Sequence, residues 1–198
     1  MSDQQSLIYT LESVVEPLRF AQMFPSEQPV ELELGSGDGS FLAEYASQHR
    51  DVNFVGVERL LGRLRKLDRK GRRAGLQNLL AIRIECSYML RYLVSPGSLS
   101  AIHVYFPDPW PKRKHWQRRL VNEGFPMIAA RALRVGGAVY LRTDDEPYSA
   151  QMQQVFRQCS SFAPFETPSG LAQAVTDFER EFNARGISTR RVAYTRVM

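Results

Sequence analysis

Apolar residues recur along the chain in short continuous runs that alternate with segments of helical spacing. The runs are rich in β-branched and aromatic residues and are bounded by glycine, proline or acidic residues, which is typical of buried strands. Between them, residues 40–49 and 59–75 place apolar side chains at intervals of three and four, which predicts helices. The predicted strands cover residues 30–34, 52–57, 79–84, 101–106, 138–142, 161–165 and 190–197.

Strands that alternate with helices in this way predict a doubly wound, mostly parallel α/β sheet. Gly136 and Gly137 are expected to end a helix, and the last strand is expected at an edge of the sheet. No linker or repeat divides the sequence, so we expect one domain over residues 1–198, with residues 1–29 covering part of it. Further helices are predicted over residues 11–23, 117–133 and 146–158.

The first strand runs directly into the glycine-rich turn GSGDG, residues 35–39. Glycines reach positive φ and carry no side chain, so the backbone of such a turn can approach a ligand closely. Glu58 ends the next strand, about 20 residues later, where an acid accepts hydrogen bonds from ribose hydroxyls. The spacing GxGxG differs from the GxGxxG of dinucleotide sites, and Glu33 precedes it. An acid there suits a cationic ligand end, which favours S-adenosylmethionine over NAD; a turn without a ligand is the alternative.

A proline-rich loop, FPDPWPK, ends the strand over residues 101–106. Its three prolines prevent continuation as a ladder or a helix, and the residue before a proline is pushed towards extended backbone. Asp108 is therefore held at the carboxyl end of the strand, beside the aromatic plane of Trp110 and the cations at 112–114. This combination indicates a pocket for a flat ligand with a charged backbone. A stiff surface turn, with Trp110 simply packed, is the alternative.

The chain carries a formal net charge of +5, and its cations gather in two clusters. In residues 59–75 the cations are opposed by Asp68 alone, and leucines form a packing stripe. The second cluster covers residues 112–119. Separate clusters of one sign suit a polyanion such as tRNA, whereas a solvated helix face is the alternative. The cations expected at an RNA backbone are Arg59, Arg63, Lys66, Lys70, Arg113 and Lys114.

Cysteine use and hydropathy exclude several classes of protein. Cys86 and Cys159 lie far apart without a CxxC motif, so we expect neither a disulfide framework nor a metal site. The start, MSDQQSLIYT, lacks the basic and apolar regions of a signal peptide, and no run of about 18 apolar residues occurs. We therefore expect a cytoplasmic protein without membrane contact.

Acidic residues follow most of the predicted strands. The carboxyl ends of parallel strands line the ligand crevice of a doubly wound sheet, so these acids are expected to meet at one edge. Glu85 would lie at the adenine end of a cofactor, or would be an ordinary solvated acid. Near the end of the chain, Thr176 and Glu179 fit a capping box. The acids expected at the crevice are Glu33, Glu58, Glu85, Asp108 and Asp144.

These motifs resemble those of the bacterial tRNA (guanine-N7-)-methyltransferases. The resemblance covers about residues 30–198 and rests on ELELGSGDG, Glu58, FPDPWPK, TDDEPY and TDFE. It implies a Rossmann-like class I methyltransferase fold, a seven-stranded sheet with an antiparallel C-terminal strand, and S-adenosylmethionine as cofactor. The implied activity is methyl transfer to N7 of a guanine in the variable loop of tRNA (position 46 in tRNA numbering), without a second protein subunit.

The resemblance also implies roles for single residues, with Asp108 as the catalytic position. Glu85 stands where the family usually has Asp, Asp145 where Trp is common, and Asp177 where Lys or Arg is common. The implied cofactor-side residues are Glu33, Gly35, Gly37, Gly39, Glu58, Glu85 and Asp108. The implied substrate-side residues are Lys112, Asp144, Thr176, Asp177, Phe178 and Glu179.

Methyl transfer to guanine N7 needs no general base, because N7 carries a lone pair and no proton. Alignment of nucleophile, methyl group and sulfur is the main requirement, and a fixed carboxylate stabilises the purine as positive charge passes to it. Asp108 and Asp144 suit this role as acceptors from the guanine N1–H and amine. Two other functions remain open. A methyltransferase for small metabolites would not need the basic clusters, and a non-enzymatic RNA-binding module would not need the aligned acids.

Overall fold

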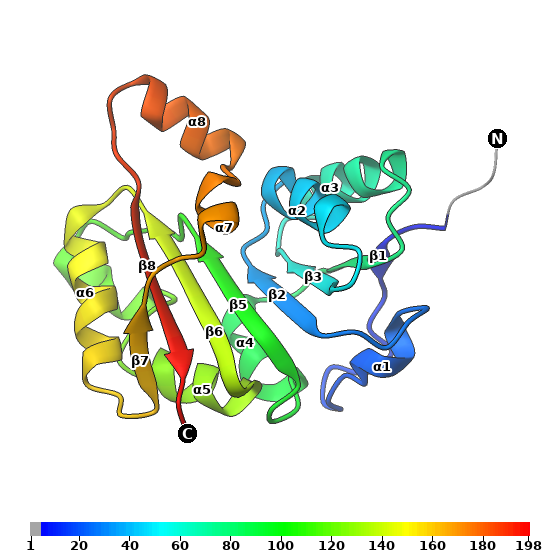
Figure 1. Cartoon of the computed structure of the whole chain (residues 1–198), viewed down its shortest axis with the longest axis horizontal. Helices are drawn as coiled ribbons and strands as arrows, with labels where there is room; N and C mark the ends of the chain where they lie inside the picture. Colours follow the sequence, from blue (N-terminus) through cyan, green and yellow to red (C-terminus); the bar gives the residue numbers. More distant parts are fainter. Residues whose placement is uncertain (1–4) are drawn as a thin grey trace. The chain divides into compact units, whose positions relative to one another are not determined.

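The computed structural model of the protein describes residues 5–198. The chain forms two compact units, unit 1, which ends at Ser95, and unit 2, Pro96–Met198 (Figure 1). The start of the expected covering segment, residues 1–4, lies outside the described residues. No helix within residues 5–198 combines the length and apolar character that a membrane crossing requires.

Within its described residues, unit 1 contains four parallel strands in the order β1-β4-β3-β2. Leu34 pairs with Val57, and Val57 pairs with Ile82, so three of the strands end at the same edge. The side chains that follow these strands are therefore brought close together. The strands are β1 (Ile8–Tyr9), β2 (Val30–Leu34), β3 (Asn53–Val57) and β4 (Leu79–Ile82).

The helices of unit 1 bury the apolar stripes that the sequence predicts. Leu64 and Leu67 of α3 are fully buried, and burial of each contributes about 2 kcal/mol. Leu60, expected in the same stripe, is instead 50% exposed because it lies before the first turn of the helix. The helical segments are α1 (Phe20–Met23), α2 (Ser40–Gln48), α3 (Leu61–Arg73), α4 (Cys86–Tyr88) and the π-helical turn η1 (Met89–Leu93).

The helix predicted over residues 11–23 is wrong for most of its length, since only α1 forms there. The hydroxyl of Ser13 accepts hydrogen bonds from the backbone N–H groups of Val15 and Glu16, which competes with helix formation. Pro17 follows directly and cannot donate an N–H to a helix. Local chemistry therefore delays the helix until Phe20.

Unit 2 contains four strands in the order β5-β6-β8-β7. β5 and β6 are parallel, and β8 is antiparallel to both of its neighbours, as expected for the last strand. Its predicted place at an edge is wrong, because β7 pairs with the other side of β8. The seven predicted strands are all present, and the two-residue β1 is an addition. The strands of unit 2 are β5 (Leu99–Tyr105), β6 (Leu133–Thr143), β7 (Phe162–Phe165) and β8 (Arg190–Arg196).

The helix predicted over residues 117–133 is shorter than expected, and the two glycines after it lie inside β6. An Asx turn, in which the side-chain oxygen of Asn122 accepts from the N–H of Gly124, precedes the helix. A Cβ on Gly137 would lie 2.8 Å from the Arg134 carbonyl oxygen, and the ladder between β5 and β6 shifts register nearby. Gly136 and Gly137 therefore form an irregularity within a strand, and the helix ends before them.

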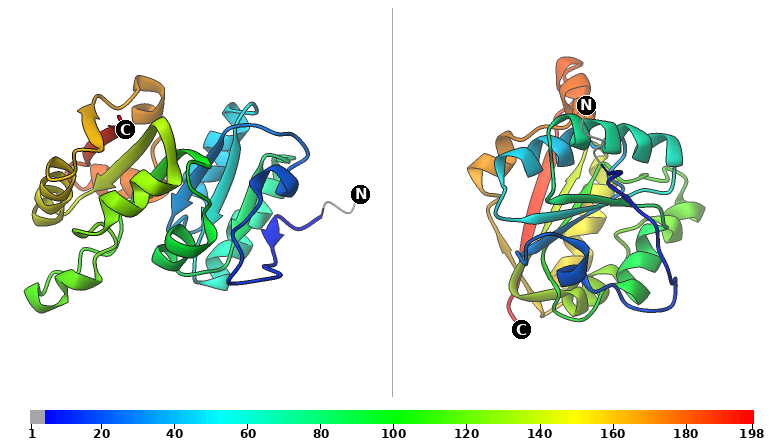
Figure 2. Two further views of the ribbon diagram at one scale, coloured as in Figure 1. Left: turned by 90° about the horizontal axis from the view of Figure 1, so that it is seen from below. Right: turned by 90° about the vertical axis from the view of Figure 1, so that its right-hand side faces the viewer.

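The remaining segments of unit 2 surround its strands. Phe156 stacks on Tyr194 at 4.2 Å, which fixes α6 against β8. The segment that contains η2 stands away from the strands of this unit (Figure 2). The helical segments are η2 (Arg113–Arg118, 3₁₀), α5 (Phe125–Ala132), α6 (Glu146–Arg157), α7 (Ser169–Gln173) and α8 (Asp177–Ala184).

Candidate active site

The glycine turn after β2 is fixed to β3 by backbone hydrogen bonds. The N–H of Gly35 donates to the carbonyl oxygen of Val57 at 2.9 Å. Gly35, Gly37 and Gly39 have φ of +83°, +56° and +73°, a region that glycine occupies without strain. A Cβ would meet nothing within 4 Å at Gly35 or Gly37, but at Gly39 it would lie 2.5 Å from Leu67. The first two glycines therefore leave space beside the turn, and Gly39 permits close packing of α3.

Two of the predicted cofactor acids hold local backbone. Glu58 is buried, and its carboxylate accepts from the N–H of Leu60 at 2.8 Å. Glu85 is the N-cap of α4, where its two oxygens accept from the N–H groups of Ser87 and Tyr88 at 2.9 and 2.7 Å. Each carboxylate oxygen has a second lone pair, so both residues retain acceptor capacity for a ligand. The sequence did not indicate these backbone contacts, and Glu is not among the residues that N-cap positions favour.

Cys86 shows how closely these groups lie together. Burial, with the charges of Glu85 and Glu58, raises the pKa of the Cys86 thiol to about 12, and a hydrogen bond with the backbone of Gly35 acts in the opposite direction. Groups that follow β2, β3 and β4 thus surround one thiol. The predicted convergence of the glycine turn, Glu58 and Glu85 is present within unit 1.

Glu33 lies inside β2, where it pairs with Gly56 of β3 and is only 3% exposed. A carboxylate that is taken out of water favours contact with a cationic group. The unit 1 residues could therefore hold a cofactor with a cationic end near Glu33, ribose hydroxyls at Glu58 and close-packed atoms against the glycine backbone. This donor set fits S-adenosylmethionine.

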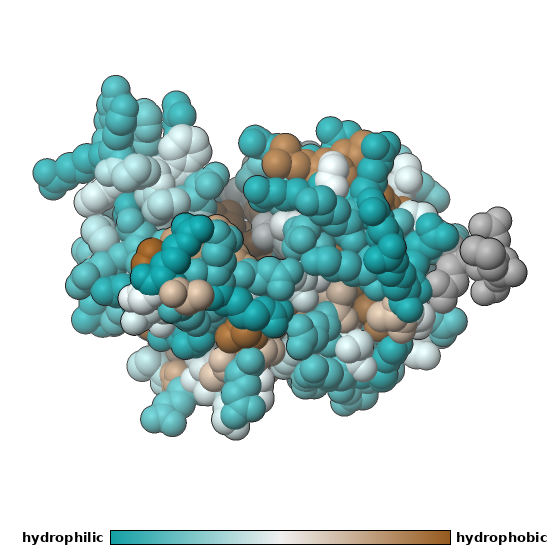
Figure 3. Space-filling view, turned by 90° about the horizontal axis from the view of Figure 1, so that it is seen from above, coloured by the Kyte–Doolittle hydropathy of each residue, from teal (hydrophilic) through white to brown (hydrophobic). Residues whose placement is uncertain are grey.

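The outward face of α3 is cationic, as the sequence predicts. Arg59, Arg63 and Lys66 are exposed, and hydrophilic surface predominates over this part of the chain in the view from above (Figure 3). Arg63 also lies 3.7 Å from the carboxylate of Glu58, and the less exposed Lys70 forms an ion pair with Asp38 of the glycine turn at 2.9 Å. Burial raises the pKa of Asp38, but the hydrogen bond and charge of Lys70, together with the N–H of Ser40 and the charge of Lys66, lower it below its ordinary value. Lys70 is therefore engaged with the turn.

The FPDPWPK loop of unit 2 has an unusual backbone. Phe106 and Trp110 have φ of +49° and +44°, which costs a non-glycine residue roughly 1–3 kcal/mol. The N–H of Phe106 still donates to the carbonyl oxygen of Arg142 at 2.8 Å, so the loop begins in register with β6. Asp108 lies exposed between the two strained residues. Such strain persists only where the surroundings impose the conformation, which is typical of functional loops.

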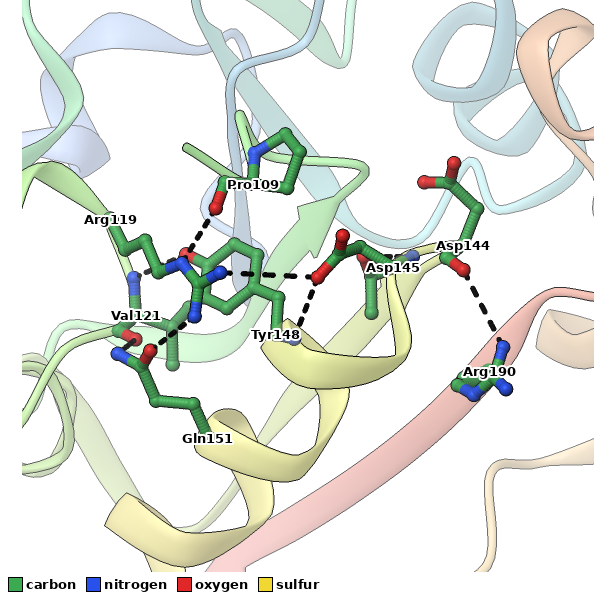
Figure 4. A network of polar contacts seen from close by, with 9 residues as sticks. Pro109, Arg119, Val121, Asp144, Asp145, Tyr148, Gln151 and Arg190 are labelled. Carbon is green, nitrogen blue, oxygen red and sulfur yellow. Dashed lines mark hydrogen bonds and ion pairs between the residues drawn. The ribbon is translucent and has the colours of Figure 1, made fainter. Parts of the chain in front are cut away.

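Arg119 is buried in unit 2, and its predicted place at the surface is wrong. Arg119, expected at the RNA backbone with its cluster, is 1% exposed. Its guanidinium lies 3.9 Å from Asp145, which caps α6 by accepting from the N–H of Tyr148 at 2.7 Å (Figure 4). Burial raises the pKa of the Tyr148 hydroxyl to about 12, and the charge of Asp108 adds to this effect. Arg119 therefore contacts the start of α6 and is not available to an RNA backbone.

Asp144 follows β6 and precedes the cap of α6. Its carboxylate points away from the Arg119 contacts, while its backbone oxygen accepts from Arg190 at 3.5 Å (Figure 4). The predicted cations Lys112, Arg113 and Lys114 are all exposed, at or before the start of η2. These groups are accessible to a substrate.

The TDFE segment opens α8, and its cap is confirmed. Thr176 accepts from the N–H of Glu179 at 2.9 Å. The Glu179 carboxylate does not complete a capping box. It is fully buried and binds Arg142 at 3.0 Å and also Arg191. In this position its side chain anchors β6 and β8 to α8 and has no access to solvent.

The exposed residues of α8 differ from Glu179. Phe178 is 45% exposed and packs on Phe106 of the loop at 5.1 Å and on Phe182 at 4.3 Å. Asp177 forms an exposed ion pair with Arg180 at 3.0 Å. The contact between Phe178 and Phe106 joins α8 to the strained loop. The expectation that the acids of unit 1 and those of unit 2 share one crevice stays a prediction.

Comparison with known proteins identifies relatives over most of the chain. The model of a family described as putative methyltransferases matches residues 27–192. A protein of Nitrosomonas europaea is 31% identical over 198 residues, covering 95% of this chain and 85% of the relative. One from Syntrophotalea carbinolica is 31% identical over 181 residues and is covered to 78%. One from Thermotoga maritima is 29% identical, and this chain covers only 56% of its length. All three are named tRNA (guanine-N(7)-)-methyltransferase.

Solved structures show the same fold at low sequence identity. The 16S rRNA methyltransferase KamB is 16% identical with a TM-score of 0.65, covering 90% of this chain and 93% of its own. TrmN from Thermus thermophilus is 18% identical with a TM-score of 0.62, covering 86% of this chain and 45% of its own. These likenesses confirm the Rossmann-like class I methyltransferase fold. By its family-model match and its 31% identical relatives, the chain belongs to the S-adenosylmethionine-dependent tRNA (guanine-N(7)-)-methyltransferases.

Proposed function

We propose that this chain transfers the methyl group of S-adenosylmethionine to N7 of a guanine in the variable loop of tRNA. The observation that carries the proposal is the strained loop after β5, which presents Asp108 to solvent between two aromatic residues with positive φ. The names of the relatives support the same substrate. The chain spans about half the length of the Thermotoga maritima relative, so we propose, and do not infer directly from that longer protein, that this chain has the same activity.

Unit 1 supplies the proposed cofactor contacts. The cofactor, when bound, provides an electrophilic methyl group on a sulfonium. We assign its amino end to the buried Glu33 and its ribose hydroxyls to Glu58, because Glu33 offers carboxylate oxygens from the last turn-side residues of β2 and Glu58 offers them directly after β3. Glu85 would accept from the adenine amine with the lone pairs that its capping bonds leave. The backbone of Gly35 and Gly37 would allow close approach, since no side chain blocks it.

Unit 2 supplies the proposed guanine contacts. Asp108 and Asp144 would accept from the guanine N1–H and amine, groups that adenine does not present in this pattern. Guanine N7 carries no proton, so Asp108 orients the base and stabilises positive charge on the ring, and it removes no proton. The reaction requires the methyl group and N7 to meet in line at near-contact distance.

Exposed cations would hold the RNA backbone. Each phosphate that they neutralise on single-stranded RNA contributes about −0.7 to the log–log salt slope. Trp110 and Phe178 offer partly exposed aromatic faces for an unstacked base. The buried position of Glu179 favours an indirect role. Its side chain would hold α8 in place, so that Thr176, Asp177 and Phe178 can contact the substrate. The cations proposed for this contact are Arg59, Arg63, Lys66, Lys112, Arg113 and Lys114.

We further propose that both units act as one domain, without a second subunit, in the cytoplasm where tRNA is modified. Incubation with methyl-labelled S-adenosylmethionine and unmodified tRNA, followed by borohydride and aniline treatment, tests the activity because strand scission reports 7-methylguanine. Scission at one variable-loop guanine is expected, and tRNA with adenine at that position should remain intact. Transfer of label to tRNA without scission would contradict the proposal and indicate another methylated atom. Absence of transfer to tRNA would favour a small-metabolite methyltransferase, or an RNA-binding module if the cofactor does not bind.

A further inference from the structure

Arg119 is the most deeply buried cation of the loop region in unit 2. Its Nε donates to the carbonyl oxygen of Pro109 at 2.6 Å, and a terminal nitrogen donates to Gln151 at 2.5 Å. Its other terminal nitrogen lies 3.9 Å from the carboxylate of Asp145 (Figure 4). A planar guanidinium presents donors in a fixed fork, so one side chain sets the spacing of three partners.

Two aromatic rings enclose the same guanidinium. Its central carbon lies 4.5 Å from the ring centre of Trp116 and 4.6 Å from that of Tyr148. Burial of a charge costs several kcal/mol unless it is well paired, and apolar residues of similar volume often stabilise a core as well. The position of Arg119 is therefore better explained by the geometry that it imposes than by stability alone.

Two of the three partners of Arg119 are direct sequence neighbours of the two proposed guanine acceptors. Pro109 follows Asp108 in sequence, and Asp145 follows Asp144. We propose that Arg119 is a positioning residue for methyl transfer, which fixes the Asp108 loop against the start of α6 and so sets the distance between the two carboxylates. This inference rests on the proposed function. Without the bond to Pro109, a loop that contains two strained residues would relax.

The test compares Arg119→Ala with Arg119→Lys. A misplacement of about 1 Å can cost about 100-fold in rate, so we expect Arg119→Ala to lower kcat for tRNA about 10- to 100-fold. The affinity for S-adenosylmethionine should stay within twofold, because its proposed contacts lie in unit 1. Arg119→Lys should remain impaired, since an ammonium lacks the planar fork.

Added guanidinium ion separates positioning from loss of stability. A groove of about 800 Å³ is lined by Trp116 and Gln151, both of which contact Arg119, so the ion can reach the truncated site. Millimolar guanidinium should restore kcat of Arg119→Ala several-fold. Recovery of the melting temperature without recovery of kcat would overturn the inference, as would a kcat of Arg119→Ala equal to that of the wild type.

Arg50, which is exposed, provides a control in unit 1. Its guanidinium also donates to backbone carbonyls, those of Ser47, Ala74 and Gly75, and it lines a smaller pocket. Arg50→Ala should lower stability while kcat stays within twofold, with no effect of guanidinium on the rate. An equal fall of kcat in both variants would mean that Arg119 acts through stability alone, which contradicts the proposal.

A second readout does not depend on the reaction. Lys112, Arg113 and Lys114 are already exposed, and release of the loop should make the backbone around them more mobile, so trypsin should cleave Arg119→Ala there several-fold faster than the wild type. Added guanidinium should slow this cleavage. Equal cleavage rates would overturn the inference even if the wild type methylates tRNA. Failure of the wild type to methylate tRNA would instead refute the proposed function, and the cleavage comparison would still decide whether Arg119 holds the loop.

Discussion

The glycine turn of unit 1 and the proline-rich loop of unit 2 both follow a strand that is parallel to its neighbour, yet they reach their conformations by different means. In the turn, the residues with positive φ are glycines, for which this backbone carries little strain. In the loop, positive φ falls on Phe106 and Trp110, where each costs roughly 1–3 kcal/mol. The turn is therefore shaped by its own sequence, whereas the loop requires external support.

That support comes from side chains outside the loop. Arg119 binds the Pro109 carbonyl, and Phe178 of α8 packs on Phe106. Glu179 fixes α8 in turn through buried Arg142. Substitutions in the turn should therefore act through local sterics, and substitutions far from the loop should still alter it.

The largest effect should follow from Glu179→Gln, which leaves the buried guanidinium of Arg142 without its anionic partner. Breaking a buried pair costs about 3–5 kcal/mol, so the free energy of unfolding in urea should fall by that amount. Asp177→Asn is the control on the same helix. Its ion pair with Arg180 is exposed, and its loss should cost well under about 1 kcal/mol. Equal effects of the two variants would show that α8 is not anchored through Glu179.

Gly39→Ala should be next in size. The added methyl group would lie 2.5 Å from Leu67, and overpacking typically costs about 1–3 kcal/mol in addition to strain at positive φ. Gly35→Ala is the matched variant, because its Cβ meets nothing within 4 Å of protein. We expect Gly39→Ala to lower the melting temperature more, and Gly35→Ala to weaken S-adenosylmethionine binding more. The opposite order in calorimetry would place the cofactor away from Gly35.

These contrasts show which features could be predicted from the sequence. The GSGDG turn, the strands around it and the positions of the acids at 33 and 58 along those strands are set by neighbouring residues, and these positions are confirmed; the cofactor-side role of the two acids stays a prediction. The burial of Arg119 and Glu179 depends in part on Gln151 and Arg142, which lie more than 30 residues away from them, and one-dimensional charge patterns assign such residues to the surface. Gly136 and Gly137 fit a helix end equally well in sequence, and only the pairing with β5 distinguishes a bulge.

The basic residues of α3, with Arg59 just before it, can be compared with basic residues elsewhere on the surface. Replacing Arg59, Arg63 and Lys66 by Gln should raise the KM for tRNA and flatten the salt dependence, by about 0.7 in log–log slope for each phosphate that the variant no longer neutralises. Replacing the exposed Arg134, Arg157 and Arg185 by Gln removes the same charge elsewhere. An equal change of slope in both triple variants would mean that only net charge matters.

The smallest effect should come from the ion pair between Lys70 and Asp38, which is partly exposed and contributes less than about 1 kcal/mol. The folded pKa of Asp38 is lowered, so the pair stabilises above the ordinary Asp pKa and the stabilisation is lost as pH falls through the folded pKa. Wild type should therefore unfold at higher urea than Lys70→Met at pH 7, and the difference should shrink below about pH 4. A difference that stays constant from pH 7 to 3 would exclude this titration.

The most direct test of the central claim, that unit 1 holds the cofactor and unit 2 positions the guanine, is a single-turnover comparison of Asp108→Ala and Glu33→Gln with calorimetric S-adenosylmethionine binding. We predict that Asp108→Ala lowers the methyl-transfer rate about 100-fold with cofactor affinity within a few fold, because it loses alignment and charge stabilisation. Glu33→Gln should mainly weaken cofactor binding. A full transfer rate in Asp108→Ala at saturating cofactor and tRNA would contradict the account.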